Sequence, residues 1–396
     1  MFPDHFPPLL WVLVPIAVAS GWYAARLRPF IPPGSGSPRG FSSNYFKGIN
    51  YLLNEQPDKA IEALIKSLQV ESDTVETHLA LGNLFRRRGE VDRAICLHQN
   101  LVAQPCLDKE QRCLAILELG MDYMRSGLLD RAEGLFRELL EQEMDLYARQ
   151  ALRQLLDLYQ LEQDWDKAIA CAQDLESRCG EDMHILTAHF YCELVEQLIW
   201  QGNSGQAQEL VKKALSIDPD CVRASLMEGM LAMEAGQLKL AIRSYKRVEQ
   251  QDPEYLGEAM RPLMECYKAL GRLDEFDDYV RSVSATHPGI TPILFLAELI
   301  ASRHGLGQAI SYLGQELQKR PSVRGLDRLL EYVLMHLDGL PRPQVELLKE
   351  FTTSLLKDKF IYKCRHCGFN LKALHWQCPS CNHWNTVKPI YGIEGV

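Results

Sequence analysis

The sequence has no excess of basic residues. Its 396 residues contain 43 Lys and Arg against 52 Asp and Glu, which gives a formal net charge of −9. Proteins that bind nucleic acid generally carry a basic stripe, so we expect no nucleic-acid partner. The last forty residues, which we call the tail, are locally basic. We interpret their charges as a docking face for the acidic remainder of the chain or for anionic lipid headgroups. The basic residues are Lys357, at the border of the tail, and Lys359, Lys363, Arg365, Lys372 and Lys388.

Motifs of catalysis are also missing. The sequence has no nucleophile elbow, phosphate-binding loop, HExxH motif or pair of carboxylates in a motif context. Histidines in helical sequence are more often packing or surface residues than ligands, and we interpret four in this way: His78, His98, His184 and His189. The sequence therefore predicts a protein that is not an enzyme.

A disulfide framework is missing as well. Eight of the twelve Cys are scattered through helical sequence without framework spacing: Cys96, Cys106, Cys113, Cys171, Cys179, Cys192, Cys221 and Cys266. Such a low density of scattered thiols is typical of a reducing compartment. We therefore expect the body of the protein to lie in the cytoplasm.

The other four Cys form two C-x-x-C pairs, Cys364 with Cys367 and Cys378 with Cys381, which are separated by ten residues. Each pair can fold as a knuckle whose sulfurs converge on one ion at about 2.3 Å, and two knuckles complete a tetrahedron. We predict that these four residues bind one iron or zinc ion, because a thiolate tetrahedron suits both metals. With no coordination position open, the site is structural or one-electron redox rather than hydrolytic.

The domain around these pairs, residues 358–396, is too short to fold without a bound metal or a disulfide to stabilise it. Two disulfides or four free thiols are the alternatives to a metal. The C-x-x-C-G and C-P-x-C pieces resemble both rubredoxin knuckles and zinc ribbons. The loop between the pairs is shorter than in a rubredoxin, and Asn382 stands where Gly is usual, so we favour a structural ion over an electron carrier. We expect a miniature core of Tyr362, Phe369, Trp376, Trp384 and Ile390, and we place His366, His375 and His383 outside the ligand set.

A run of twenty uncharged residues, from Phe6 to Ala25, lies near the start of the chain. A helix of that length is about 30 Å long, the thickness of the hydrocarbon core of a bilayer. Arg26 and Arg28 follow it, and the positive-inside rule then keeps the downstream side in the cytoplasm. We predict a transmembrane anchor over residues 1–28 and a Pro/Gly/Ser-rich linker over 29–43. A cleaved signal peptide and a buried core helix are the alternatives.

Residues 44–357 repeat a pair of amphipathic helices with a period near the 34 residues of tetratricopeptide repeats. Alignment on one small residue of the second helix gives intervals of 34, 38, 36, 39, 34, 35 and 33 residues: Ala60, Ala94, Ala132, Ala168, Ala207, Ala241, Phe276 and Ala309. Glycines recur five residues before this position, where the turn requires positive φ: Gly89, Gly127, Gly202, Gly236 and Gly271. Other glycines recur twelve residues before it: Gly48, Gly82, Gly120 and Gly229.

This recurrence predicts an all-α fold, a tetratricopeptide superhelix of about eight helix pairs with a concave inner surface. An ordinary helical bundle is the alternative. Residues Leu329 to Leu356 read as a further, degenerate helix pair that caps the array.

The combination of anchor, repeat array and four-Cys tail resembles the lipopolysaccharide assembly protein B family of Gram-negative bacteria. The likeness covers nearly the whole chain apart from the long linker. It is carried by these stretches: Gly21-Trp-Tyr, His78-Leu-Ala-Leu-Gly-Asn-Leu-Phe-Arg86, Ala188-His-Phe-Tyr-Cys-Glu-Leu194, Tyr362-Lys-Cys-Arg-His-Cys-Gly-Phe369 and Trp376-Gln-Cys-Pro-Ser-Cys381.

The resemblance implies a regulatory protein on the cytoplasmic face of the inner membrane. Members of the family promote degradation of the deacetylase that commits precursor to lipid A, and the degradation is carried out by a membrane-anchored AAA+ protease. The resemblance also implies that the four-Cys domain packs against the array and that Cys364, Cys367, Cys378 and Cys381 hold the metal. A scaffold for other lipopolysaccharide assembly proteins, an electron carrier and a homodimer remain open as alternatives.

Overall fold

The computed structural model describes residues 43–54, 56–70, 75–105, 107–142, 144–287, 289–336 and 342–393. The predicted anchor and nearly all of the predicted linker lie outside these residues, as does Cys106. None of the helices in the described ranges combines the length and apolar character needed to cross a bilayer. The chain divides between Ser126 and Gly127 into two compact units.

The first unit is made of helices that pack in sequence order, α2 on α3, α4 on α5 and α5 on α6. Apolar side chains at helical spacing form its core, in which Leu64, Leu81 and Phe85 are buried. The helices are α2 (Ser43–Leu53), α3 (Pro57–Val70), α4 (Val75–Arg88), α5 (Val91–Val102) and α6 (Lys109–Ser126).

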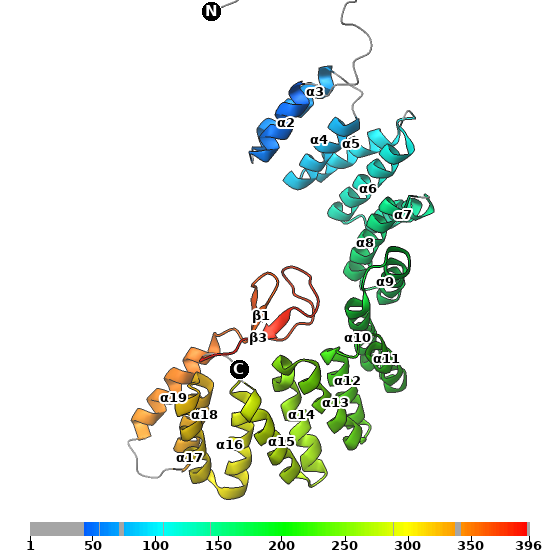
Figure 1. Cartoon of the computed structure of the whole chain (residues 1–396). Coiled ribbons are helices and arrows are strands. Elements are labelled where there is room, and N and C mark those ends of the chain that lie inside the picture. Colours follow the sequence, from blue (N-terminus) through cyan, green and yellow to red (C-terminus); the bar gives the residue numbers. More distant parts are fainter. Residues whose placement is uncertain are drawn as a thin grey trace, which may run out of the picture. The chain divides into compact units, whose positions relative to one another are not determined.

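The second unit continues the same helix-pair pattern and ends in three short strands (Figure 1). Its helices are α7 (Leu129–Glu141), α8 (Asp145–Glu162), α9 (Trp165–Cys179), α10 (His184–Trp200), α11 (Ser204–Ile217), α12 (Val222–Glu234), α13 (Leu238–Gln251), the 3-10 turn η1 (Pro253–Tyr255), α14 (Leu256–Ala269), α15 (Leu273–Thr286), α16 (Thr291–His304), α17 (Leu306–Lys319), α18 (Val323–His336) and α19 (Arg342–Lys357). The degenerate last pair is thus α18 and α19, and α18 starts six residues earlier than predicted.

The aligned position of the repeat is the closest packing point of each helix pair. All seven Ala residues at this position, and Phe276 in the seventh helix pair, are 0% exposed. The glycine twelve residues before the aligned position faces the side chain four residues after the aligned position. A Cβ added at Gly82 would lie 2.3 Å from the His98 ring, and one added at Gly229 would lie 2.6 Å from the Tyr245 ring. The predicted tetratricopeptide fold is therefore confirmed, and His98 is a packing residue as expected.

The turn position of the repeat has positive φ in the described helix pairs that carry glycine there, from 67° at Gly271 to 87° at Gly89. In the α8–α9 turn, the same position is occupied by Gln163, which adopts φ 58°. A residue with a Cβ adopts this conformation only at an energetic cost. Gln163 keeps the geometry of the repeat and adds a side chain that the five glycine turns lack.

The C-terminal strands form a small antiparallel sheet of order β2-β1-β3, with β1 (Tyr362–Cys364), β2 (Asn370–Leu371) and β3 (Val387–Pro389). Tyr362 pairs with Leu371 on one side and with Pro389 on the other. The sheet carries the first C-x-x-C knuckle at the end of β1, while the second knuckle lies in the long connection from β2 to β3.

Candidate metal centre

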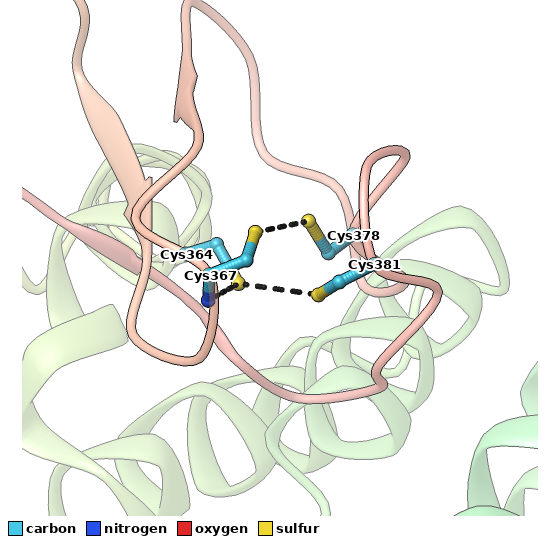
Figure 2. Close-up of side chains that lie close together, drawn as sticks. All are labelled: Cys364, Cys367, Cys378 and Cys381. Carbon is cyan, nitrogen blue, oxygen red and sulfur yellow. Dashed lines mark hydrogen bonds between the residues drawn. The ribbon is translucent and has the colours of Figure 1, made fainter. Parts of the chain in front are cut away.

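The four cysteines of the tail lie together with their sulfurs facing one another (Figure 2). The Sγ atoms of Cys364 and Cys381 are 3.8 Å apart, and those of Cys367 and Cys378 are 3.7 Å apart. A regular tetrahedron with metal–sulfur bonds of about 2.3 Å has edges of about 3.8 Å. The donor set therefore fits a closed, structural metal site of the rubredoxin or zinc-ribbon type.

Both knuckles turn in the same way. The N–H of Gly368 donates to the carbonyl of Cys364 (2.9 Å), and the N–H of Asn382 donates to the carbonyl of Cys378 (2.8 Å). Gly368 has φ 78° and Asn382 has φ 56°. Asn is one of the few residues other than Gly that tolerates this region, so Asn382 preserves the knuckle. Its presence is therefore no argument against a rubredoxin-like site, contrary to the reasoning from sequence.

The thiols differ in how readily they ionise. Burial opposes ionisation of Cys364, but hydrogen bonds from Thr386 and from the backbone N–H groups of Cys367 and His366 lower its pKa to about 6. A backbone hydrogen bond from His383 lowers the pKa of Cys381, but burial and the three neighbouring sulfurs raise it to about 12. Four thiolates at these separations repel one another, and a bound cation removes that repulsion.

Two histidines lie beside the sulfurs. The rings of His366 and His383 stack with their centroids 3.6 Å apart, and their nitrogens lie within 4.8 Å of the Cys381 sulfur. Both histidines are exposed, whereas Cys364 and Cys378 are buried. Cys367 is exposed too, but the group of His366, Cys381 and His383 offers only three ligand atoms, so the four sulfurs remain the better ligand set.

The four-Cys domain packs against the inner side of the second unit. Tyr255 of η1 is 1% exposed and donates a hydrogen bond to the carbonyl of Val387 in β3 (2.8 Å). The Trp376 ring lies 5.2 Å from the Tyr255 ring. In addition, Tyr362 of β1 donates to the carboxylate of Glu258 in α14. These contacts join the C-terminal domain to η1 and α14 in the middle of the second unit.

A second contact is made by Trp384. Its indole N–H donates to Gln160 Oε1 in α8 (2.8 Å). Its ring lies 6.1 Å from Trp165 in α9 and 5.8 Å from Phe190 in α10, both edge-on, and 5.3 Å from His189. Burial of His189, together with the charges of Arg223 and Lys388, lowers its pKa to about 3. This histidine is therefore neutral where it meets the tail.

Ion pairs complete the docking. Lys388 pairs with Asp252 and lies over the Tyr255 ring, while Arg365 pairs with Glu254 at 3.2 Å. Two of the basic tail residues therefore contact acidic residues of the array, as the docking-face interpretation expects. The Arg365 pair is exposed and contributes little, whereas Lys388 is largely buried.

The predicted miniature core is only partly correct. The buried core of the tail consists of Tyr362, Leu371, Val387 and the two buried cysteines, Cys364 and Cys378. Phe369 is 46% exposed, and Trp376 and Trp384 pack against array residues instead. The tail is too small to cover both indole rings, and the array provides the apolar surface that buries them.

Sequence reasoning missed three array residues that receive the tail, Gln160, Trp165 and Tyr255. It interpreted a fourth, His189, as a packing or surface residue without its partners in the tail. No motif marks them, because each sits at an ordinary position of its repeat. The one available signal was the number of aromatic residues in the tail, which exceeds what a domain of about forty residues can bury.

Comparison with known proteins gives matches over both parts of the chain. A family model described as a rubredoxin metal binding domain matches residues 362–389, and tetratricopeptide repeat models match residues 77–112 and 198–255. Lipopolysaccharide assembly protein B of Escherichia coli K12 is 38% identical over 389 residues, covering 98% of this chain and 99% of that protein. The protein of the same name from Haemophilus influenzae is 36% identical over 395 residues, with the same coverage.

Proposed function

Because the chain belongs to the lipopolysaccharide assembly protein B family, we propose that it is an inner-membrane adaptor rather than an enzyme. In this proposal it limits lipopolysaccharide synthesis by bringing the deacetylase that commits precursor to lipid A to the membrane-bound AAA+ protease. The observation that supports this role is the docking of the four-Cys domain on η1 and helices α8 and α14 of the second unit, which gives one body suited to binding a protein.

The proposed anchor at residues 1–28 and linker at 29–43 give the adaptor its advantage. An anchored body at 44–357, with its metal domain at 358–396, searches for partners in two dimensions. Its effective concentration near a membrane protease is therefore high. The proposed topology is a single membrane pass with the body on the cytoplasmic side. Protease digestion of inside-out vesicles should then cleave the body, while right-side-out vesicles should protect it.

We propose that Cys364, Cys367, Cys378 and Cys381 hold one zinc or iron ion with a structural role. The ion would hold the two knuckles together, and the tail would then present Trp376 and Trp384 to the array. Metal analysis with a visible absorption spectrum separates the two metals. A colourless protein with one zinc per chain after iron-replete growth would exclude electron transfer through this site.

The adaptor role is tested by the half-life of the deacetylase. A strain that lacks this protein should degrade the deacetylase more slowly and accumulate it. An unchanged half-life in the deletion strain would contradict the adaptor proposal. Restoration of fast degradation by the wild-type chain serves as the control.

The name of the relatives, which refers to assembly, favours a second candidate: a scaffold that gathers lipopolysaccharide assembly proteins at the membrane. The two proposals differ in the partners recovered after mild solubilisation. Recovery of biosynthetic enzymes without the protease supports the scaffold, whereas recovery of the protease without other biosynthetic enzymes argues against it. The same preparation, analysed by light scattering, tests for a homodimer.

A further inference from the structure

A continuous groove follows the seam between the four-Cys domain and the helices that receive it. It consists of three pockets of about 770, 370 and 500 Å³. The first and second pockets share Gln160 and Gln377, and the second and third share Arg223, Leu374 and Trp376. We call this feature the seam groove. Helices α8, α10 and α12 form one wall and the tail forms the other, so neither part makes the groove alone.

The seam groove is apolar toward both ends. In the first pocket, Leu161 is 61% exposed and Ile185 is 42% exposed. In the third pocket, Trp200 is 89% exposed and lies with Met227 and Met230. Single exposed apolar side chains are common, but apolar groups gathered in a concave site mark binding surfaces, and Trp and Met are enriched in such surfaces.

The middle of the groove is polar. Gln160, Gln163 and Gln377 line the second pocket. Gln160 already accepts from the Trp384 indole, and Gln377 already donates to the carbonyl of Asn382. Each amide has two donor hydrogens and an oxygen with two lone pairs, so further hydrogen bonds can form. This is the chemistry that pairs with the N–H and C=O groups of an extended peptide. Gln163 is the residue that keeps φ 58° where other turns have glycine, and strain of this kind is concentrated at functional sites.

The groove is also acidic. Four carboxylates line the three pockets (Asp157, Asp182, Glu193 and Glu196) against a single guanidinium, that of Arg223. Arg223 is already paired with Glu193 at 2.8 Å and with Glu196 at 2.6 Å. The remaining negative charge lies mainly on Asp157 and Asp182 of the first pocket. It favours a basic residue of a bound partner where the middle of the groove meets that pocket.

We propose that the seam groove binds an extended peptide segment that has an apolar side chain toward each end and Lys or Arg between them. The inference deepens the adaptor proposal, because such a segment would belong to a protein that the adaptor delivers. It also predicts that a folded tail is needed for binding, since the tail forms one wall of the groove.

The test uses the full chain in zwitterionic lipid nanodiscs, with empty nanodiscs as a blank. The probes are two fluorescein-labelled peptides of equal length with Leu near each end; one carries Lys-Arg in the middle and the other carries Glu-Glu. Fluorescence anisotropy should show at least tenfold tighter binding of the Lys-Arg peptide. Equal affinity for the two peptides, or no binding of either, would overturn the proposal.

Two variants locate the binding. Trp200→Ala should weaken binding of the Lys-Arg peptide about tenfold. The variant should still fold, because the Trp200 side chain is 89% exposed. The matched control is Leu146→Ala, which removes a side chain that is 61% exposed on α8 but outside the groove. Asp157→Lys should reduce the preference between the two peptides, whereas Glu176→Lys on α9, outside the groove, should not.

If the controls and the groove variants behave alike, the peptide binds elsewhere and the inference is wrong. That result would leave the adaptor proposal intact, because the half-life of the deacetylase decides it separately. Conversely, peptide binding in the groove together with an unchanged deacetylase half-life would leave the groove as the binding site of some other protein.

Discussion

Replacement of Trp384 by Ala should release the four-Cys domain from the array while leaving its metal in place. Trp384 is 8% exposed and is in contact with Trp165, His189 and Phe190. Truncation of a buried Trp to Ala typically costs about 3–5 kcal/mol. We expect the lower end, about 3 kcal/mol, because the undocked tail can relax. That change lowers the docking equilibrium constant about 150-fold.

A graded variant separates the two contributions of this side chain. Trp384→Phe keeps an aromatic ring but removes the 2.8 Å hydrogen bond to Gln160. A neutral hydrogen bond contributes about 1 kcal/mol, so docking should weaken only about fivefold. Phe369→Ala is the control within the tail, because its side chain is 46% exposed.

Hydrogen–deuterium exchange measures the outcome. In Trp384→Ala, amides around Tyr255 and in β3 should exchange faster, while the metal content measured by mass spectrometry stays at one ion per chain. Unchanged protection of these amides would refute the argument that Trp384 anchors the tail. Loss of both the metal and the protection of these amides from exchange would show that docking and metal binding cannot be separated.

Three further results are expected. The Cys364→Ser variant should lose the metal and its tail should unfold, because structural metal binding supplies about 10 kcal/mol or more of folding free energy. The helical circular dichroism should persist. Full complementation of a deletion strain by a Cys364→Ser/Cys378→Ser double variant would contradict this expectation. Gln163→Gly should raise stability by up to about 1 kcal/mol and the melting temperature by about 2–4 °C, because Gly relieves the positive φ; a lower melting temperature in calorimetry would count against it. Burial depresses the His189 pKa from its ordinary value near 6.5 to about 3. The stability that neutral His189 contributes to docking is therefore complete above pH 6.5, and it is lost as the pH falls toward 3. Hydrogen exchange across that range, with metal content measured in parallel, should show a shallower loss in His189→Gln, and an identical pH profile would exclude His189 as the cause.

The repeat array was predictable because its determinants are local. Ala94, Gly82 and Gly89 lie within one helix pair, and each is fixed by a short-range requirement: close helix packing at the first two and positive φ at the third. The gathering of the four cysteines was predictable for the same reason, since two knuckles and a ten-residue loop confine them. Such requirements recur at fixed spacing and can be read from one sequence.

The docking of the tail could not be read in this way. Gln160 and Trp384 are 224 residues apart in the sequence, and nothing near Gln160 indicates that it accepts the indole hydrogen bond. The aromatic residues of the tail suggested a self-contained core, but a domain of this size has too little interior for two Trp rings. Asn382 was misread for a different reason, because a residue type was compared with a pattern while its backbone conformation was unknown.

The position of the tail at the end of the chain has a consequence for biosynthesis. The ribosome completes α8 long before it reaches Trp384, and at about 5–20 residues per second the 224 intervening residues take roughly 10–45 s. From the time each is made, Trp165, Phe190 and Tyr255 lack the contacts with Trp384 and Trp376, and they acquire them only when the last segment is made and its knuckles close. A cell that is short of the metal would therefore produce chains that expose the apolar surface which normally receives the tail. Chaperones and proteases recognise exposed apolar surface of this kind. The supply of one ion would then set how much of the protein escapes degradation.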